Sequence, residues 1–142
     1  MSGRELVSGS YEGLPRKYRK ALESTKESIA YLKGNLRQEE LAFDVDGFTL
    51  ETALKKTEDL LSRSQLFDED SLKTIAKVAL VWSMLYVTIQ RNRQLGVTVY
   101  QELQRSGSPI GREAMEMRVS RESHQQLEIC LGALRKALAN DS

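Results

Sequence analysis

Residues 78–89 read VALVWSMLYVTI and carry no formal charge. Nearly every position is apolar, so a helix in this stretch has no polar face to turn toward water and has to be buried in protein or in lipid. Because a membrane-spanning helix needs roughly 20 apolar residues, a run of this length favours a core helix. We therefore expect these residues to form the central, buried helix of the fold, with Trp82 as a packing residue.

Charged residues on both sides set the bounds of this central helix. The acidic run 68–70 places anionic groups at a helix start, where they are favourable. Arg91 and Arg93 lie near the expected C-terminal end, and Gly96 is a typical helix stop. The pattern predicts a helix over about 69–95.

Apolar residues at helical spacing predict two further helices before it. The first covers about 15–38, since Pro15 is tolerated in the first turn of a helix. A connector at 43–48, with an Asp-Gly turn signal and two Phe residues, leads to Thr49 as an N-cap. A second helix then covers about 50–64.

After the central helix, residues 97–105 either continue it or form a short helix of their own. The sequence Ser-Gly-Ser-Pro at 106–109 is the clearest break in the chain, and it suits a helix stop followed by a new start. The last helix is expected over about 109–139. From Met117 onward its stripe advances in alternating steps of three and four residues, the spacing of a helix-packing seam.

Together these elements predict an all-α fold, a four- or five-helix bundle with a buried central apolar helix (about 69–95) and a long C-terminal helix (about 109–139). Residues 1–13 are rich in Ser and Gly and lack apolar periodicity, which indicates a flexible N-terminal arm. Residues 14–142 form a single helical domain, for which a chain of 142 residues is long enough.

The residue types that bind metals or act as nucleophiles are scarce in this chain. It holds one His and one Cys, and His124 and Cys130 are six positions apart, about 240° around a helix, so they do not share a face. The sequence around Asp44, Asp46 and Gly47 lacks the later ligands of a calcium loop. No phosphate-binding loop, dinucleotide fingerprint or GxSxG motif is present. We expect no metal, no cofactor and no small-molecule substrate.

The spacing of Arg118 and His124 resembles the R-x(4–6)-H motif of HEPN ribonucleases, which are small helical proteins that often dimerise. The resemblance implies that Arg118 stabilises charge on a scissile phosphate and that His124 transfers a proton. A polar residue commonly follows the arginine of that family, and here the position is Val119. The alternative is that His124 is a polar member of a helix-packing seam.

Positive charge is concentrated near the N-terminus, where residues 1–38 carry a net charge of +4. A basic helix face can bind the phosphates of nucleic acid or of a membrane surface. The candidate residues for such binding are Arg16, Lys17, Arg19, Lys20, Lys26, Lys33 and Arg37. A solvated helix surface is the plainer interpretation of the same residues.

The C-terminal helix offers a second candidate surface. Its seam supplies the interface candidates Met117, His124, Leu127, Leu131, Leu134 and Leu138. Outside this seam lie Met115, Ile129 and Cys130, which widen the apolar surface. Such a helix either faces the core or binds a second chain.

The lack of catalytic groups and the regular seam favour a non-enzymatic interaction or assembly protein. It would self-associate or dock into a larger complex through its C-terminal helix and charged faces. A nucleic-acid-binding protein, an HEPN-like ribonuclease and a membrane-associating protein are the alternatives. Without a secretory signal pattern at the N-terminus, we expect an intracellular, cytoplasmic location.

Overall fold

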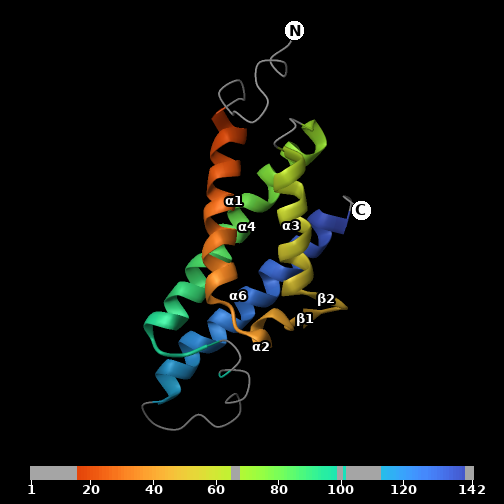
Figure 1. The fold of residues 1–142 in the computed structure, drawn as a ribbon. Helices are drawn as coiled ribbons and strands as arrows, with labels where there is room; N and C mark the ends of the chain where they lie inside the picture. Colours follow the sequence, from red (N-terminus) through yellow and green to blue (C-terminus); the bar gives the residue numbers. More distant parts are fainter. Residues whose placement is uncertain (1–15, 65–67, 99–100, 102–112, 140–142) are drawn as a thin grey trace.

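A computed structural model describes residues 16–64, 68–98, 101 and 113–139, with the backbone alone for 113–121 (Figure 1). The elements in chain order are α1 (Arg16–Asn35), α2 (Gln38–Leu41), β1 (Asp44–Val45), β2 (Phe48–Thr49), α3 (Leu50–Ser64), α4 (Glu69–Gln94) and α6 (Glu113–Ala139). The described chain is helical apart from one small hairpin, which confirms the all-α prediction and the long C-terminal helix. The predicted arm at 1–13 lies outside the described residues.

The apolar helix α4 is the centre of the fold, as its sequence predicts. It packs against α1, α3 and α6, and α1 crosses in front of it in Figure 1. Its core face presents Val78, Trp82, Leu85 and Ile89, all fully buried. Burying side chains of this size stabilises the fold by about 1.5–3 kcal/mol each.

The ends of α4 follow from its flanking residues. Asp68 is the N-cap, and its Oδ2 accepts a hydrogen bond of 2.6 Å from Ser71 Oγ. At the other end Gly96 adopts a φ of +73°, and the amide of Val97 donates to the Asn92 carbonyl at 2.8 Å. This geometry is that of a Schellman stop, so α4 does not continue into residues 97–105.

A separate helix start follows this stop. The amide of Thr98 donates to Gln101 Oε1 at 3.1 Å, and the amide of Gln101 donates to Thr98 Oγ1 at 3.0 Å. Reciprocal bonds of this kind form a capping box, which favours the alternative of a short separate helix. The rest of that segment, and the predicted start of the last helix at 109, lie outside the described residues.

The connector between α1 and α3 is more ordered than the sequence indicates. The Asp-Gly turn has φ values of 54° at Asp46 and 84° at Gly47, which joins β1 and β2 as a tight antiparallel hairpin. Thr49 then caps α3, because the Thr52 amide donates to Thr49 Oγ1 at 3.1 Å. The predicted turn at Asp46 and Gly47 is confirmed, and two residues on each side of it also pair as strands, which the sequence analysis did not predict.

The first helix is shorter than predicted, because Arg93 of α4 binds the segment that follows it. Its Nη2 donates to the Asn35 carbonyl at 2.5 Å and to Glu40 Oε1 at 2.5 Å, and its Nη1 donates to Glu40 Oε2 at 3.2 Å. The Glu40 side chain is fully buried and also accepts from the Arg37 amide. Helix α1 therefore ends at Asn35, and the chain turns into α2 around the ion pair of Arg93 and Glu40.

Burial of α4 is not complete around the helix, and this differs from the sequence expectation for residues 78–89. Leu80 is 70% exposed, Val87 is 45% exposed and Met84 is 37% exposed. They share the face opposite Trp82, where no described element packs over them. The buried face of α4 holds the fold together, and its outer face is left open.

Candidate functional site: a groove between α4 and α6

The outer face of α4 carries a regular row of side chains. Lys77, Leu80, Met84, Val87 and Arg91 follow one another in steps of three and four residues, so they lie on one side of the helix, and all five are exposed. We call these five residues the outer stripe of α4. Its three central members are apolar and its two ends are cationic.

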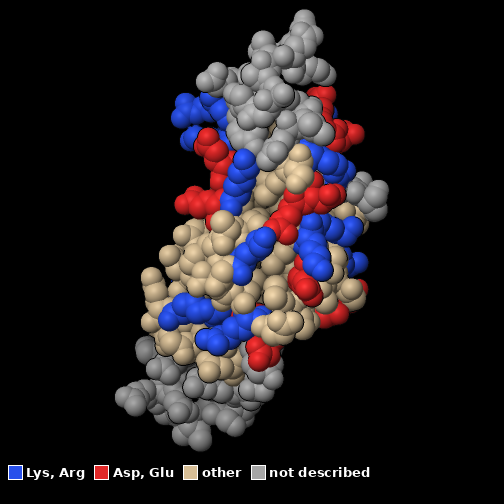
Figure 2. Space-filling model, in the orientation of Figure 1, with Lys and Arg blue, Asp and Glu red and all other residues tan. Residues whose placement is uncertain are grey.

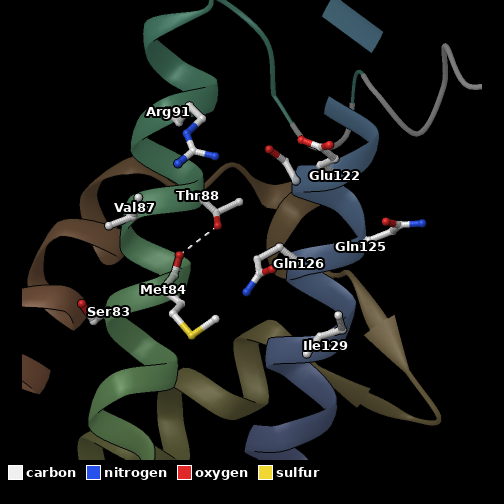
Figure 3. Close-up of a pocket in the computed structure, with 10 residues that line it drawn as sticks. Ser83, Met84, Val87, Thr88, Arg91, Glu122, Gln125, Gln126 and Ile129 are labelled. Atoms are coloured by element: carbon white, nitrogen blue, oxygen red, sulfur yellow. Dashed lines mark hydrogen bonds between the residues drawn. The ribbon is translucent and has the colours of Figure 1, made fainter. Parts of the chain in front are cut away.

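A groove of about 530 Å³ runs between this side of α4 and the neighbouring face of α6 (Figure 3). Its lining residues are Ser83, Met84, Val87, Thr88 and Arg91 of α4, and Glu122, Ser123, Gln125, Gln126 and Ile129 of α6. We call it the α4–α6 groove. Its volume falls in the range of protein binding pockets.

The side chains of the two walls are placed differently. In Figure 3, Met84 and Gln126 each point toward the opposite helix, and Val87 lies on the rim on the side away from α6. Ile129 is 64% exposed on the α6 wall. The groove therefore has apolar side chains on both walls and an apolar rim on α4.

Two buried polar side chains in or near the groove have no hydrogen-bond partner in the part of the chain that the structure describes. Ser123, a lining residue, is 3% exposed and its Oγ makes no hydrogen bond. One turn beyond Thr88, Asn92 is fully buried, and both atoms of its amide group also lack partners. Unpaired buried polar groups cost free energy, so they are uncommon in folded proteins. Thr88 is satisfied, since its Oγ1 donates to the Met84 carbonyl at 2.8 Å.

The charges around the groove are unevenly distributed. At one end Arg91 of α4 and Glu122 of α6 both line the groove, and no ion pair joins them. Lys77 lies two turns before Met84 on the same face, and within the described chain neither Lys77 nor Arg91 has a carboxylate partner. The outer stripe of α4 therefore carries a cation at each end, and Arg91 is the one that lines the groove.

The interface residues predicted on the C-terminal helix face inward. Leu127, Leu131, Leu134 and Leu138 are fully buried in the same core cluster as Trp82. They pack against other residues of this chain. A second chain could reach them only if the helices of this protein that cover them moved away. The side chain of Met117 lies outside the described residues. Ile129, which the sequence places outside the seam, is the exposed large apolar residue among the described side chains of α6.

The basic residues predicted for phosphate binding do not form one continuous face. Arg16, Lys17 and Lys20 are exposed at the start of α1, but exposed Glu23 and Glu27 follow on the same helix. Arg19, Lys26 and Lys33 follow one another at intervals of seven along α1, but Arg19 is partly buried and Lys33 Nζ pairs with Glu58 at 2.6 Å. Arg37 is exposed beyond the end of α1. In the view of Figure 2, red and blue side chains alternate across the upper part of the molecule. Mixed signs weaken the field that a nucleic acid needs.

His124 lies in α6 and has mainly structural contacts. Its ring meets Phe43 edge-on at 5.4 Å between centroids, and its Nε2 is 3.9 Å from Glu128 Oε2. The Nδ1 atom is buried without a hydrogen-bond partner. The side chain of Arg118 lies outside the described residues, and six positions along one helix turn the backbone by about 600°, so the two residues start from different faces.

The thiol of Cys130 is buried on α6. Burial raises its pKa, against the smaller opposing effect of a hydrogen bond from Gln126 Nε2 at 3.8 Å. A buried thiol of raised pKa holds little thiolate and is a poor nucleophile or metal ligand. Among the residues that the structure describes, no three His, Cys, Asp or Glu side chains gather as a potential metal site.

One of the described helices, α4, is long and apolar enough to cross a membrane. The core helix of a soluble protein meets the same criterion, and one face of α4 is buried inside this fold. Its composition alone therefore does not separate a core helix from a membrane helix.

The sequence contains a pattern that could have pointed to the groove, but the apolar residues of α4 on every side hide it. The outer stripe of α4 has heptad-like spacing between two cations, but the residues between its members are apolar as well. The pattern therefore shows no polar face that would mark the solvent-exposed side of the helix.

No protein-family model, no curated protein and no solved structure matches this chain.

Proposed function

We propose that this chain is a non-enzymatic helical interaction protein that binds another protein through the α4–α6 groove. Its core would act as a scaffold that holds α4 and α6 at a fixed separation. The groove between them would then be the working surface, in place of the inward-facing seam of α6.

A single observation carries this proposal: the central helix of the fold exposes Leu80, Met84 and Val87 in a row, with exposed Ile129 across the groove. Contiguous exposed apolar surface beside a groove is typical of sites that bind proteins or ligands. Met84 adds to this, because methionine side chains adapt their shape to different partners.

The chemistry of the groove supports binding over catalysis. Among the described residues, its lining has one arginine, one glutamate and several amide and hydroxyl side chains, without a histidine, cysteine or paired carboxylates. General acid–base or nucleophilic catalysis needs such groups within hydrogen-bond reach of one another. Apolar side chains with a few polar ones around them are what a protein interface contains.

A selection experiment tests the proposal directly. A display library of helical peptides, unbiased in charge, is selected for binding to the full-length chain. Each enriched peptide is then measured against the variants Val87→Glu and Ile129→Glu. We expect enriched peptides that lose at least about tenfold in affinity for both variants, because each substitution replaces an apolar contact of the groove or its rim with a carboxylate that the bound helix would have to desolvate.

The matched control is Ala30→Glu, which adds the same charge at an exposed position of α1 outside the groove. It should bind the enriched peptides as the unmodified chain does. Failure to enrich any peptide, or equal binding by the groove variants and the control variant, would overturn the proposal. Burial of Trp82, followed by its fluorescence, verifies that each variant is folded.

A further inference from the structure

We infer that the partner of the α4–α6 groove is an amphipathic helix with an apolar centre and carboxylate side chains about two turns to either side of it. This inference rests on the proposed function and adds the chemistry of the partner. It is carried by the order of charges along the outer stripe of α4.

The apolar centre of the stripe has the spacing of a helix seam. Leu80, Met84 and Val87 are separated by four and three residues, and Ile129 stands on the opposite wall of the groove. A helix laid along a groove of this kind meets it with side chains at i, i+3 or i+4, and i+7.

The cations bracket this centre symmetrically. Lys77 precedes Met84 by seven residues and Arg91 follows it by seven, which is about 10.5 Å in each direction along the helix. Both are exposed and neither has a carboxylate partner in the part of the chain that the structure describes. A bound helix of about 18 residues with Asp or Glu at both ends would pair with both.

The same symmetry disfavours a second copy of this chain as the occupant. If two α4 helices packed antiparallel about Met84, Lys77 of each would lie opposite Arg91 of the other. If they packed parallel, Lys77 would meet Lys77. Like charges are directly opposed in either arrangement, which is unfavourable, so the outer stripe disfavours packing against the outer stripe of a second copy.

An anionic membrane fits the groove less well than a helix does. The surface is concave rather than flat. Gln125 and Gln126 add uncharged polar groups that have no counterpart in an acyl chain. A helix can direct its own polar side chains to these groups and its carboxylates to the α4 rim.

The test uses two synthetic helical peptides of about 18 residues with identical apolar centres. One carries Glu at both ends and the other carries Lys at the same positions, and binding to the full-length chain is measured by fluorescence anisotropy. We expect the Glu peptide to bind about tenfold more tightly at low salt, with the preference shrinking as salt is added.

A charge-reversal pair of variants sharpens the test. The double variant Lys77→Glu/Arg91→Glu should prefer the Lys peptide. The matched control Lys17→Glu/Lys20→Glu, which makes the same change in net charge at the start of α1, should keep the preference for the Glu peptide. Comparison of the two double variants separates charge contacts at the groove from long-range attraction by the net charge of the protein.

Four outcomes would overturn the inference, and they identify which part fails. Equal binding of both peptides, abolished by Val87→Glu, would remove the carboxylate requirement and leave the proposed function standing. Binding of neither peptide, with no helix enriched from the library, would remove both. Val87-dependent binding to equimolar phosphatidylserine and phosphatidylcholine vesicles, without peptide binding, would assign the groove to a membrane. Self-association that competes with the peptide would assign it to a second copy.

Discussion

Trp82 Nε1 donates a hydrogen bond of 3.0 Å to Thr57 Oγ1, and both side chains are fully buried. This bond joins α4 to α3 at the centre of the core. It gives the indole N–H the partner that a buried polar group requires. The most apolar helix of the chain is therefore fixed in rotation by one polar contact as well as by packing.

Thr57→Val should destabilise the fold by about 1–3 kcal/mol, because it leaves the indole N–H buried without an acceptor while keeping the side-chain volume. The free energy of unfolding, measured by denaturant titration, checks this. Thr57→Ser keeps the acceptor and should cost less. In the double variant with Trp82→Phe the threonine change should become nearly neutral, and strict additivity of the two changes would contradict the bond.

Arg93→Met should cost about 2–4 kcal/mol, because Glu40 would keep a buried charge without its guanidinium partner. Arg93 itself is 20% exposed, which moderates the effect. The exposed Arg91, two residues earlier on the same helix, supplies the control: Arg91→Met should change the free energy of unfolding by less than about 0.5 kcal/mol. Equal effects of the two substitutions would refute the role of the ion pair.

Two glycines should respond to alanine in opposite directions. Gly96→Ala should destabilise the chain by about 1 kcal/mol, because its φ of +73° is strained for a residue with a Cβ atom. Gly34 lies inside α1, and a Cβ added there meets nothing within 4 Å, so Gly34→Ala should stabilise by about 0.5–1 kcal/mol. Thermal unfolding of both variants measures the signs.

The two faces of α4 should separate binding from stability. Val87→Ser should leave the free energy of unfolding within about 0.5 kcal/mol, because the side chain has few neighbours to lose. Leu85→Ala, two positions away on the buried face, should cost about 2–5 kcal/mol. A large loss of stability in Val87→Ser would show that the outer stripe serves the fold and not a partner.

Cys130 should react slowly with thiol reagents while the chain is folded, since burial blocks access and raises the thiol pKa. The linkage has a definite sign: above the ordinary thiol pKa the unfolded chain loses this proton before the folded chain does. Stability therefore falls as pH rises through that range, and Cys130→Ala should weaken the fall. Alkylation rates with and without denaturant, and unfolding at neutral and alkaline pH, measure both effects.

The bounds of α3 and α4 were predictable because their signals are local. Thr49 caps one helix, Asp68 begins the other and Gly96 ends it, and each acts within one turn of the chain. The shortening of α1 was not predictable, since it depends on Arg93, which is 58 residues beyond Asn35. The pairing of β1 with β2 was not predictable either, because each strand has two residues, which are too few to show the alternating pattern of a strand.

By itself the sequence determined that residues 78–89 form the central helix of an all-α fold, because an uncharged stretch of this length has to leave water. Only the tertiary structure decided which face of that helix is covered. Apolar content is similar all round α4, whereas burial depends on where α1, α3 and α6 pass. They cover the face of Trp82 and leave Leu80, Met84 and Val87 exposed beside the groove. A surface that depends on helices distant in the chain is not encoded in the local pattern.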